Sequence, residues 1–220
     1  IQKTLSERFQ MMMKKKIDMI LASSSPRRKE ILESVGACFR IVTSDADESV
    51  PAELPPDGFV CEIAERKCEA VLEKLKSNGE LRRETLVIAC DTVVVYGGMV
   101  IGKPLDEAHA ILTLGILSDS WHSVYSGLAV YYKGRIVTRA ARTDVKFRAL
   151  SEREIMAYAE SGEPMGKAGS YAIQMKGASF VERIEGEFNN VVGLPLVSLL
   201  ALVREEFGLE SDDILDFQRG

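Results

Sequence analysis

The sequence is poor in the residues that usually build metal centres and disulfides. It contains two histidines and four cysteines in 220 residues, and no two cysteines form a C-x-x-C pair. A structural zinc site needs cysteine and histidine ligands at close, regular spacings, so this sequence excludes one. The cysteines are therefore expected to be buried free thiols, which indicates a reducing compartment and a cytoplasmic protein.

Long apolar runs and an excess of positive charge are also missing. No apolar stretch reaches the length of a transmembrane helix. The formal net charge of -5 argues against nonspecific binding to nucleic acid or to an anionic membrane, so we expect neither partner. It leaves room for a small anion in one local basic pocket. Residues 1–16, which end in "QMMMKKK", lack the apolar core of a secretory signal and are expected to be a flexible extension.

Helix and strand patterns alternate along the rest of the chain. Apolar positions recur at helical spacing over residues 60–75, and "NG" at 78–79 ends that helix. The β-branched run "TLVIACDTVVVY" at 85–96 indicates a central strand, and the glycines at 97–98 then provide a hairpin turn. A longer hairpin is expected over 121–147. Helices mixed with hairpins indicate an α/β fold with a mixed β-sheet flanked by helices.

The ends of this core are less regular. After the first strand we expect a helix that Ser25 caps and Gly36 ends. Towards the C-terminus the sequence predicts short strands in "SYAIQ" (170–174) and "ASFVERI" (178–184). A last helix is expected in "LVSLLALVREEF", with a frayed acidic tail beyond it.

Asp91 attracts notice because it interrupts an otherwise apolar strand. A carboxylate is costly to bury unless it is paired. Asp91 is therefore either a salt-bridged core residue or a metal ligand or general base facing a cleft. We favour the second interpretation, because buried aspartates without a partner are rare.

A positive cluster stands at the start of a helix in "SSSPRR" (23–28). Serine hydroxyls, the free N–H groups of a first helical turn and two guanidinium groups together suit a phosphate. The same residues are equally typical of a capped helix with a solvated basic face. The spacing alone does not decide between the two.

Two lysines and a group of loop carboxylates complete the polar candidates. Lys67 interrupts apolar helical positions, so either its stem snorkels or its ammonium faces the same cleft. Lys103 in "IGKP" is a weak signal on its own. Asp45, Asp47 and Glu48 are either solvated or hard oxygen ligands for Mg²⁺.

Two local motifs imitate enzymes of other classes. "DEAH" (106–109) imitates a helicase element, and "GEPMGKA" (162–168) imitates a P-loop. The second has three residues between its glycines instead of four, and it ends in alanine where serine or threonine must reach Mg²⁺. Neither histidine lies in the context of a Ser-His-Asp triad. These classes are therefore disfavoured.

Taken together and in order, the polar segments resemble the Maf family of nucleoside triphosphate pyrophosphatases over residues 17–207. The segments are "LASSSPRR", "DE" at 47–48, "AERKCEAV", "ACDTVVV", "GKP", "HSVYSG", "TDVKFRALSEREI", "GKAGSYAIQMKGASFVERIEG" and "NNVVGLPL". The resemblance implies an elongated α/β fold like that of inosine triphosphate pyrophosphatases, often as a homodimer. It also implies a single domain over 17–209 with a central cleft, followed by a tail at 210–220.

The same resemblance implies the site residues. The catalytic positions fall on Asp91, Glu48, Lys67 and Lys103, and Asp91 is the implied proton acceptor. The substrate-binding positions fall on Ser23, Arg27, Arg28, Thr92 and Gln174, of which Arg27, Thr92 and Gln174 are implied to set substrate choice. Without the resemblance, Gln174 would be taken as a residue that caps a sheet edge.

A divalent metal is implied as cofactor: Mg²⁺, with Mn²⁺ or Co²⁺ as alternatives, held by Glu48 and Asp91. The "YAIQ" segment is similar to the branch that hydrolyses dTTP and UTP to the monophosphate and pyrophosphate. Met175 departs from that branch, which often has glycine there. Two alternatives stay open: a nucleotide-binding regulator of cell division without turnover, and a pyrophosphatase for 7-methyl-GTP or another nucleotide. Carboxylates repel a triphosphate unless a metal intervenes, which favours an enzyme over a pure binder.

Overall fold

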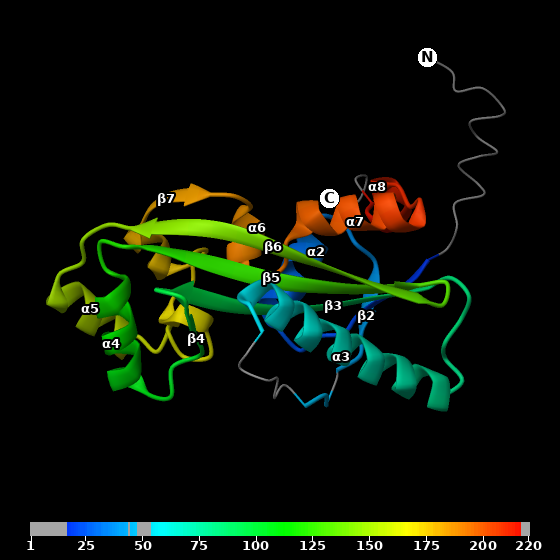
Figure 1. Cartoon of the computed structure of the whole chain (residues 1–220), viewed down its shortest axis with the longest axis horizontal. Coiled ribbons are helices and arrows are strands. Elements are labelled where there is room, and N and C mark those ends of the chain that lie inside the picture. Colours follow the sequence, from blue (N-terminus) through cyan, green and yellow to red (C-terminus); the bar gives the residue numbers. More distant parts are fainter. Residues whose placement is uncertain (1–16, 44, 48–53, 217–220) are drawn as a thin grey trace, which may run out of the picture.

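The computed structural model describes residues 17–43, 45–47 and 54–216. Over these residues the molecule is elongated and is built on one mixed sheet with helices packed against it (Figure 1). The predicted fold class is therefore confirmed. The predictions for residues 1–16 and for Glu48 lie outside the described residues, and the predicted domain boundaries stay predictions.

Three long strands form the spine of the sheet. The strand order is β2-β1-β3-β5-β6-β7, and β4 pairs with β3 off this path. β1 runs parallel to β2 and β3, whereas all the other strand pairs of the described residues are antiparallel. The strands are β1 (Asp18–Leu21), β2 (Phe39–Ile41), β3 (Thr85–Tyr96), β4 (Met99–Ile101), β5 (Trp121–Tyr132), β6 (Arg135–Phe147) and β7 (Val181–Glu185).

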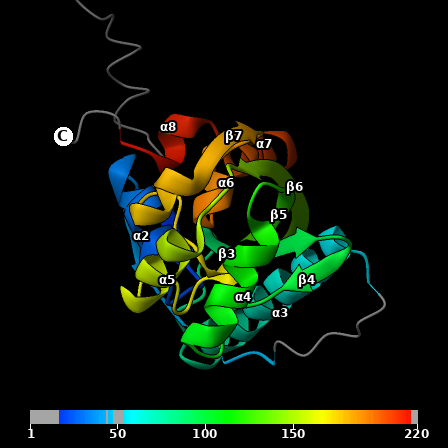
Figure 2. The same cartoon turned by 90° about the vertical axis from the view of Figure 1, so that its left-hand side faces the viewer.

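The helices divide between the two faces of the sheet. They are α2 (Pro26–Ser34), α3 (Pro56–Ser77), α4 (Glu107–Leu117), α5 (Glu152–Glu160), α6 (Phe188–Val192), α7 (Leu196–Phe207) and α8 (Ser211–Ile214). Successive side chains of a strand point to opposite faces, and β3 obeys this rule. Its Val87 and Ala89 join the apolar cluster under α3, whereas Leu86 and Ile88 join the larger cluster that includes α2 and α7. Figure 2 shows the sheet end-on, with α3 on the side away from α7 and α8.

Two sequence predictions near the C-terminus are wrong. "SYAIQ" forms no strand: a 3-10 turn spans Ala168–Ser170 and further turns follow, so that β7 begins only at Val181. Gly166, Gly169 and Ser170 have φ angles of +73°, +69° and +60°, which an extended strand cannot accommodate. The apolar residues of this segment are buried as the pattern predicts, but Tyr171 and its neighbours are buried in a folded loop and not in a sheet.

The tail after α7 is not frayed where the structure describes it. α8 follows directly, with a capping box between Glu210 and Asp213. Ile214 and Leu215 are buried in the main core. The backbone of Asp216 donates to the carbonyl of Gly36, at the end of α2, with a distance of 3.2 Å. Apolar side chains therefore anchor this segment in spite of its acidic composition.

The helix starts follow the predictions in position but not always in chemistry. α2 begins at Pro26 as expected, and Gly36 beyond its end has a φ of +73°. Ser25 occupies the N-cap position, yet its side chain makes no capping hydrogen bond. Instead its backbone N–H donates to Oγ of Ser23, at 3.2 Å. The predicted capping by the Ser25 side chain is therefore wrong, although the residue holds the N-cap position.

Helix α3 lies unusually close to the sheet at one glycine. Gly127 in β5 pairs with Asp91 in β3. A Cβ atom on Gly127 would lie 2.2 Å from the carbonyl oxygen of Val60 in α3 and 2.5 Å from the backbone nitrogen of Cys61. Only glycine permits this approach of helix to strand.

The prediction of free thiols is confirmed, but burial is confirmed only for two of the four cysteines. All four cysteines are free, and Cys68 and Cys90 are buried while Cys38 is exposed. In the described part of the chain, no helix combines the length and apolarity that crossing a bilayer requires.

Candidate active site

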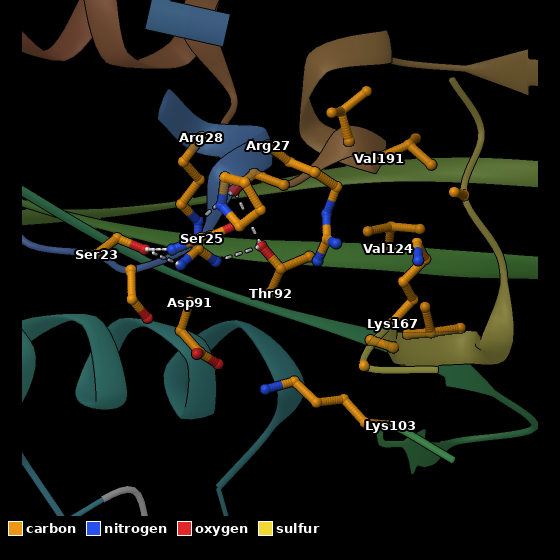
Figure 3. A pocket seen from close by; sticks show the side chains of 18 of the residues that line it. Ser23, Ser25, Arg27, Arg28, Asp91, Thr92, Lys103, Val124, Lys167 and Val191 are labelled. Atoms are coloured by element: carbon orange, nitrogen blue, oxygen red, sulfur yellow. Dashed lines mark hydrogen bonds between the residues drawn. The ribbon is translucent and has the colours of Figure 1, made fainter. Parts of the chain in front are cut away.

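A cavity of about 320 Å³ lies where the centre of β3, the loop from β1 into α2, the end of α6 and residues 166–174 meet. It brings together every predicted site residue that the structure describes: Ser23, Arg27, Arg28, Lys67, Asp91, Thr92, Lys103 and Gln174. The ninth, Glu48, lies outside the described residues. Figure 3 shows most of the polar members converging from separate elements.

Asp91 is held at the cavity by an ion pair. It has the same strand parity as Val87 and Ala89, so it faces α3. Nζ of Lys67 donates to its Oδ1 at 2.7 Å, and the two side chains are only 14% and 13% exposed. Asp91 is thus salt-bridged, as in the interpretation we did not favour, and it also lines a cavity, as in the one we favoured. Lys103 extends its ammonium toward the same carboxylate (Figure 3).

Arg28 ties three segments together. Its Nε donates to the carbonyl of Gly193 at 2.8 Å, Nη1 to Oγ of Ser23 at 3.0 Å, and Nη2 to Oγ1 of Thr92 at 3.2 Å. Oγ1 of Thr92 also lies 2.8 Å from Oγ of Ser126. Each guanidinium nitrogen therefore has a protein acceptor, so this side chain fixes the shape of the cavity wall.

Arg27 behaves differently from its neighbour. Its guanidinium reaches into the cavity (Figure 3) and makes no hydrogen bond to the described residues. Burial lowers the pKa of Arg27, the positive charge of Arg28 lowers it further, and Glu30 opposes both effects. A half-buried cation without a hydrogen-bond partner among the described residues is suited to receive an anion or a carbonyl oxygen from a ligand.

Lys167 also lines the cavity, and the sequence did not predict it. Its Nζ donates to the backbone carbonyl of Glu163 at 2.5 Å. Burial lowers the pKa of Lys167, and the charge of Arg27 adds to that effect while Glu163 opposes it. The available signal was a lysine directly after a glycine in "MGKA", the same pattern that pointed to Lys103 in "IGKP". The sequence predictions assign that stretch to an imitation P-loop and to a segment of the family resemblance, with no role for Lys167.

The described side chains that line the cavity carry a large excess of positive charge. Among the described lining residues, Asp91 is the sole carboxylate, and the cations that share the lining are Arg27, Arg28, Lys67, Lys103 and Lys167. Apolar surface is supplied by Val94, Val124, Ala168, Tyr171, Val191 and Val192. The arrangement suits a ligand with a polyanionic end and a flat, partly apolar end.

The donor set fits a magnesium ion that a substrate helps to hold. Within the described residues, no three carboxylate, histidine or cysteine side chains are placed to coordinate a metal on their own. Mg²⁺ usually binds through one or two carboxylates together with substrate phosphates and water. Asp91, at the wall of a cationic cavity, can be one such ligand.

The sequence matches the family model described as Maf-like protein over residues 18–206. The chain belongs to this family. The predicted family resemblance is therefore confirmed.

Individual relatives of this Maf-like chain carry a consistent description. It is 42% identical over 187 residues to a protein of Bacillus cereus (strain AH820) called dTTP/UTP pyrophosphatase, covering 85% of this chain and 94% of the relative. A protein of the same name from Bacillus mycoides (strain KBAB4) is 43% identical over 194 residues, covering 88% and 96%. Among solved structures, the Ham1 protein of Staphylococcus aureus aligns with a TM-score of 0.40 and 12% identity, over 59% of this chain and 71% of that one.

Proposed function

We propose that this Maf-like chain is a nucleoside triphosphate pyrophosphatase that hydrolyses dTTP and UTP to the monophosphate and pyrophosphate. The names of its relatives support the reaction and the substrates. The observation that carries the proposal is the cavity itself, whose described lining holds five cationic side chains and a single carboxylate, Asp91. A triphosphate with about four negative charges matches this excess of cations.

In the proposed reaction, the oxygen of water bonds to the α-phosphorus of the nucleotide. The bond from that phosphorus to the oxygen bridging the α- and β-phosphates breaks, and pyrophosphate leaves with the electron pair. Asp91 accepts the proton of the attacking water. Lys67, bonded to Oδ1 of Asp91, keeps the carboxylate oriented while it does so.

The cations act on the charge that develops on the phosphates. Lys103 and Lys67 stabilise the leaving pyrophosphate by charge-assisted hydrogen bonds. Arg28 contributes mainly as a brace, because its three donors already hold Ser23, Thr92 and Gly193. Preorganised donors of this kind need no rearrangement when the transition state forms.

Asp91 would hold a divalent metal, Mg²⁺ by preference, with Glu48 as the second proposed ligand. When bound, the ion neutralises phosphate charge and polarises the phosphorus centre. Mn²⁺ and Co²⁺ are the proposed substitutes.

The test is release of pyrophosphate from a panel of dTTP, UTP, CTP, GTP and 7-methyl-GTP, with Mg²⁺ and with a chelator in its place. We expect turnover of dTTP and UTP that exceeds turnover of the other nucleotides and is lost on chelation. Strongest turnover of 7-methyl-GTP would reassign the substrate. Tight nucleotide binding without pyrophosphate release would support the alternative of a regulator of cell division.

We further propose that the enzyme works in the cytoplasm and as a homodimer. Its free thiols favour a reducing compartment. Sedimentation of the purified protein would decide the oligomeric state.

A further inference from the structure

Lys167 lines the cavity but has no role in the proposed reaction. It belongs to the irregular segment between α5 and β7, whereas Asp91 and Lys67 belong to a strand and a helix. In Figure 3 Lys167 lies on the side of Val124 and Val191, and Arg27 reaches toward that side. Asp91 and Ser23 lie on the other side of the same view. The cation and the apolar surface therefore occur together, away from the carboxylate.

Apolar walls identify this side as the place for the base. A nucleobase is a flat ring with polar atoms on its edge, and apolar side chains bury such rings well. A triphosphate instead needs cations and the carboxylate that the reaction requires. If the phosphates lie at Asp91, then the base lies at Val124 and Val191, within the reach of Lys167.

Lys167 is held ready before any ligand binds. Its Nζ donates to the carbonyl of Glu163 at 2.5 Å. Glu163 is itself only 7% exposed, and its Oε1 accepts from the hydroxyl of Tyr158 at 2.9 Å and from the N–H of Gly177 at 3.1 Å. An ammonium has three N–H donors, and the contact with Glu163 uses one of them. The others can serve a ligand.

We propose that Lys167 donates a hydrogen bond to the 4-oxo group of a bound uracil or thymine, and that this contact makes the cavity reject cytosine. The inference rests on the proposed function. It assigns a specificity-determining role to a residue outside the reaction chemistry.

The chemistry of the two candidate readers separates their roles. Uracil and thymine present a carbonyl oxygen at position 4, whereas cytosine presents an amino group that donates there. The amide of Gln174 carries both an acceptor and a donor, so it can turn over and suit either base. The ammonium of Lys167 has donors only and cannot adapt. Lys167 therefore supplies the discrimination that a glutamine alone cannot supply.

The oxygen at position 4 can accept from both side chains at once. A carbonyl oxygen has two lone pairs, so Gln174 and Lys167 do not compete for it. With cytosine, the amino group would point its hydrogens at a half-buried cation. Facing donors repel one another, and the ammonium would lose a partner that it has with uracil.

The experiment compares Lys167→Met with a matched control, Lys176→Met. Both lysines lie on the same segment, but Lys176 is exposed and does not line the cavity. kcat/KM is measured for UTP, dTTP and CTP. We expect Lys167→Met to lower the ratio of UTP to CTP by about tenfold or more, which is the scale of one lost charge-assisted hydrogen bond. Lys176→Met should leave the ratio unchanged.

Two further arms isolate the contact. Lys167→Arg keeps a donor-only cation and should retain the preference for UTP even if its rate falls. The triphosphate of a pyrimidin-2-one riboside carries only hydrogen at position 4, so Lys167→Met should affect it no more than it affects CTP. An equal loss for all four nucleotides would overturn the proposal and assign Lys167 to the phosphates. An unchanged ratio in Lys167→Met would overturn it as well.

The experiment distinguishes failure of the proposed function from failure of the inference about Lys167. If the parent released no pyrophosphate from UTP, the function would be wrong, yet the inference could still be measured as binding. The dissociation constants of α,β-methylene UTP and α,β-methylene CTP give the same ratio without turnover. A preference for the uracil analogue that is lost in Lys167→Met supports the contact, and its persistence overturns it.

Discussion

The cavity has two walls that are built in different ways. The strand-side wall consists of residues 22–28 with Asp91 and Thr92, and it rests on the sheet and on α2 and α3. The loop-side wall consists of residues 166–174, which contain no strand. The first wall holds its polar groups in a dense set of side-chain bonds around Arg28. The second wall is held by hydrogen bonds to residues outside it, which do not line the cavity.

The supports of the loop-side wall are buried polar pairs. Glu163 fixes the segment through Tyr158 and Gly177, and the backbone N–H of Ala172 donates to the same tyrosine hydroxyl at 3.1 Å. Tyr171 is tied to β5 by a contact of 2.9 Å between its hydroxyl and Nε2 of His122. The proposed reaction chemistry therefore lies on a wall built from the sheet, whereas Gln174 and Lys167, two of the proposed specificity residues, lie on a loop.

The comparison predicts that the largest effect follows from a change on the strand-side wall. Asp91→Asn is nearly isosteric and should leave the protein folded. Loss of the general base should lower kcat for every nucleotide by at least about a hundredfold, without changing the order of preference. Pyrophosphate release by a variant of normal melting temperature is the measurement. Turnover close to that of the parent would remove Asp91 from the chemistry.

A smaller effect is expected where the loop-side wall is attached to the sheet. Burial lowers the pKa of His122 from 6.5 to about 4, and Asp144 opposes the shift. As pH falls below 6.5, the unfolded chain takes up the proton first, so stability present above that pH is lost progressively toward pH 4. Between pH 7.5 and pH 5 this histidine should cost the parent about 2 kcal/mol of unfolding free energy.

Urea unfolding at the two pH values measures this cost. His122→Phe should show a loss smaller than that of the parent by about this amount. His109→Gln is the matched control, because His109 is exposed and lies on α4. Equal losses in parent and His122→Phe would show that this histidine does not titrate as a buried group.

The smallest effect is expected from Gln174→Glu on the loop-side wall. A carboxylate can accept from N3–H of uracil or thymine but cannot donate to the oxygen at position 4. kcat/KM for dTTP and UTP should therefore fall by about tenfold, the equivalent of about 1.4 kcal/mol. GTP, which offers N–H donors on its edge, should lose less or gain. Unchanged proportions among dTTP, UTP and GTP would place Gln174 away from the base.

Sequence reasoning succeeded where periodicity and burial agree. The long helix α3, the central strand β3 and the hairpin of β5 and β6 follow from apolar spacing and turn glycines, because these elements bury the faces that the pattern marks. It failed at "SYAIQ", whose apolar residues are buried by a loop. Three glycines, Gly162, Gly166 and Gly169, and Ser170 all have positive φ angles, which no propensity for strands reveals.

The site shows the same division. Asp91 could be found from the sequence, because a carboxylate in an apolar strand is costly to bury without a partner or a function. Its partner Lys67 could be found in the same way, since it interrupts the apolar positions of a helix. The hydrogen bond from Arg28 to the carbonyl of Gly193 could not be found from the sequence, because Gly193 lies 165 residues further along the chain. Lys167 was missed because its importance comes from the cavity that the loop encloses and not from its immediate neighbours.

The close approach at Gly127 has a consequence for how the ion pair is spaced. Gly127 lies opposite Asp91, and Val60, which it touches, lies two helical turns from Lys67, or about 10 Å along α3. The depth at which the helix sits on the sheet therefore decides whether the ammonium of Lys67 can meet the carboxylate. That depth is possible because Gly127 has no Cβ atom. A search for reactive side chains would pass over this position, although the distance within the ion pair depends on it.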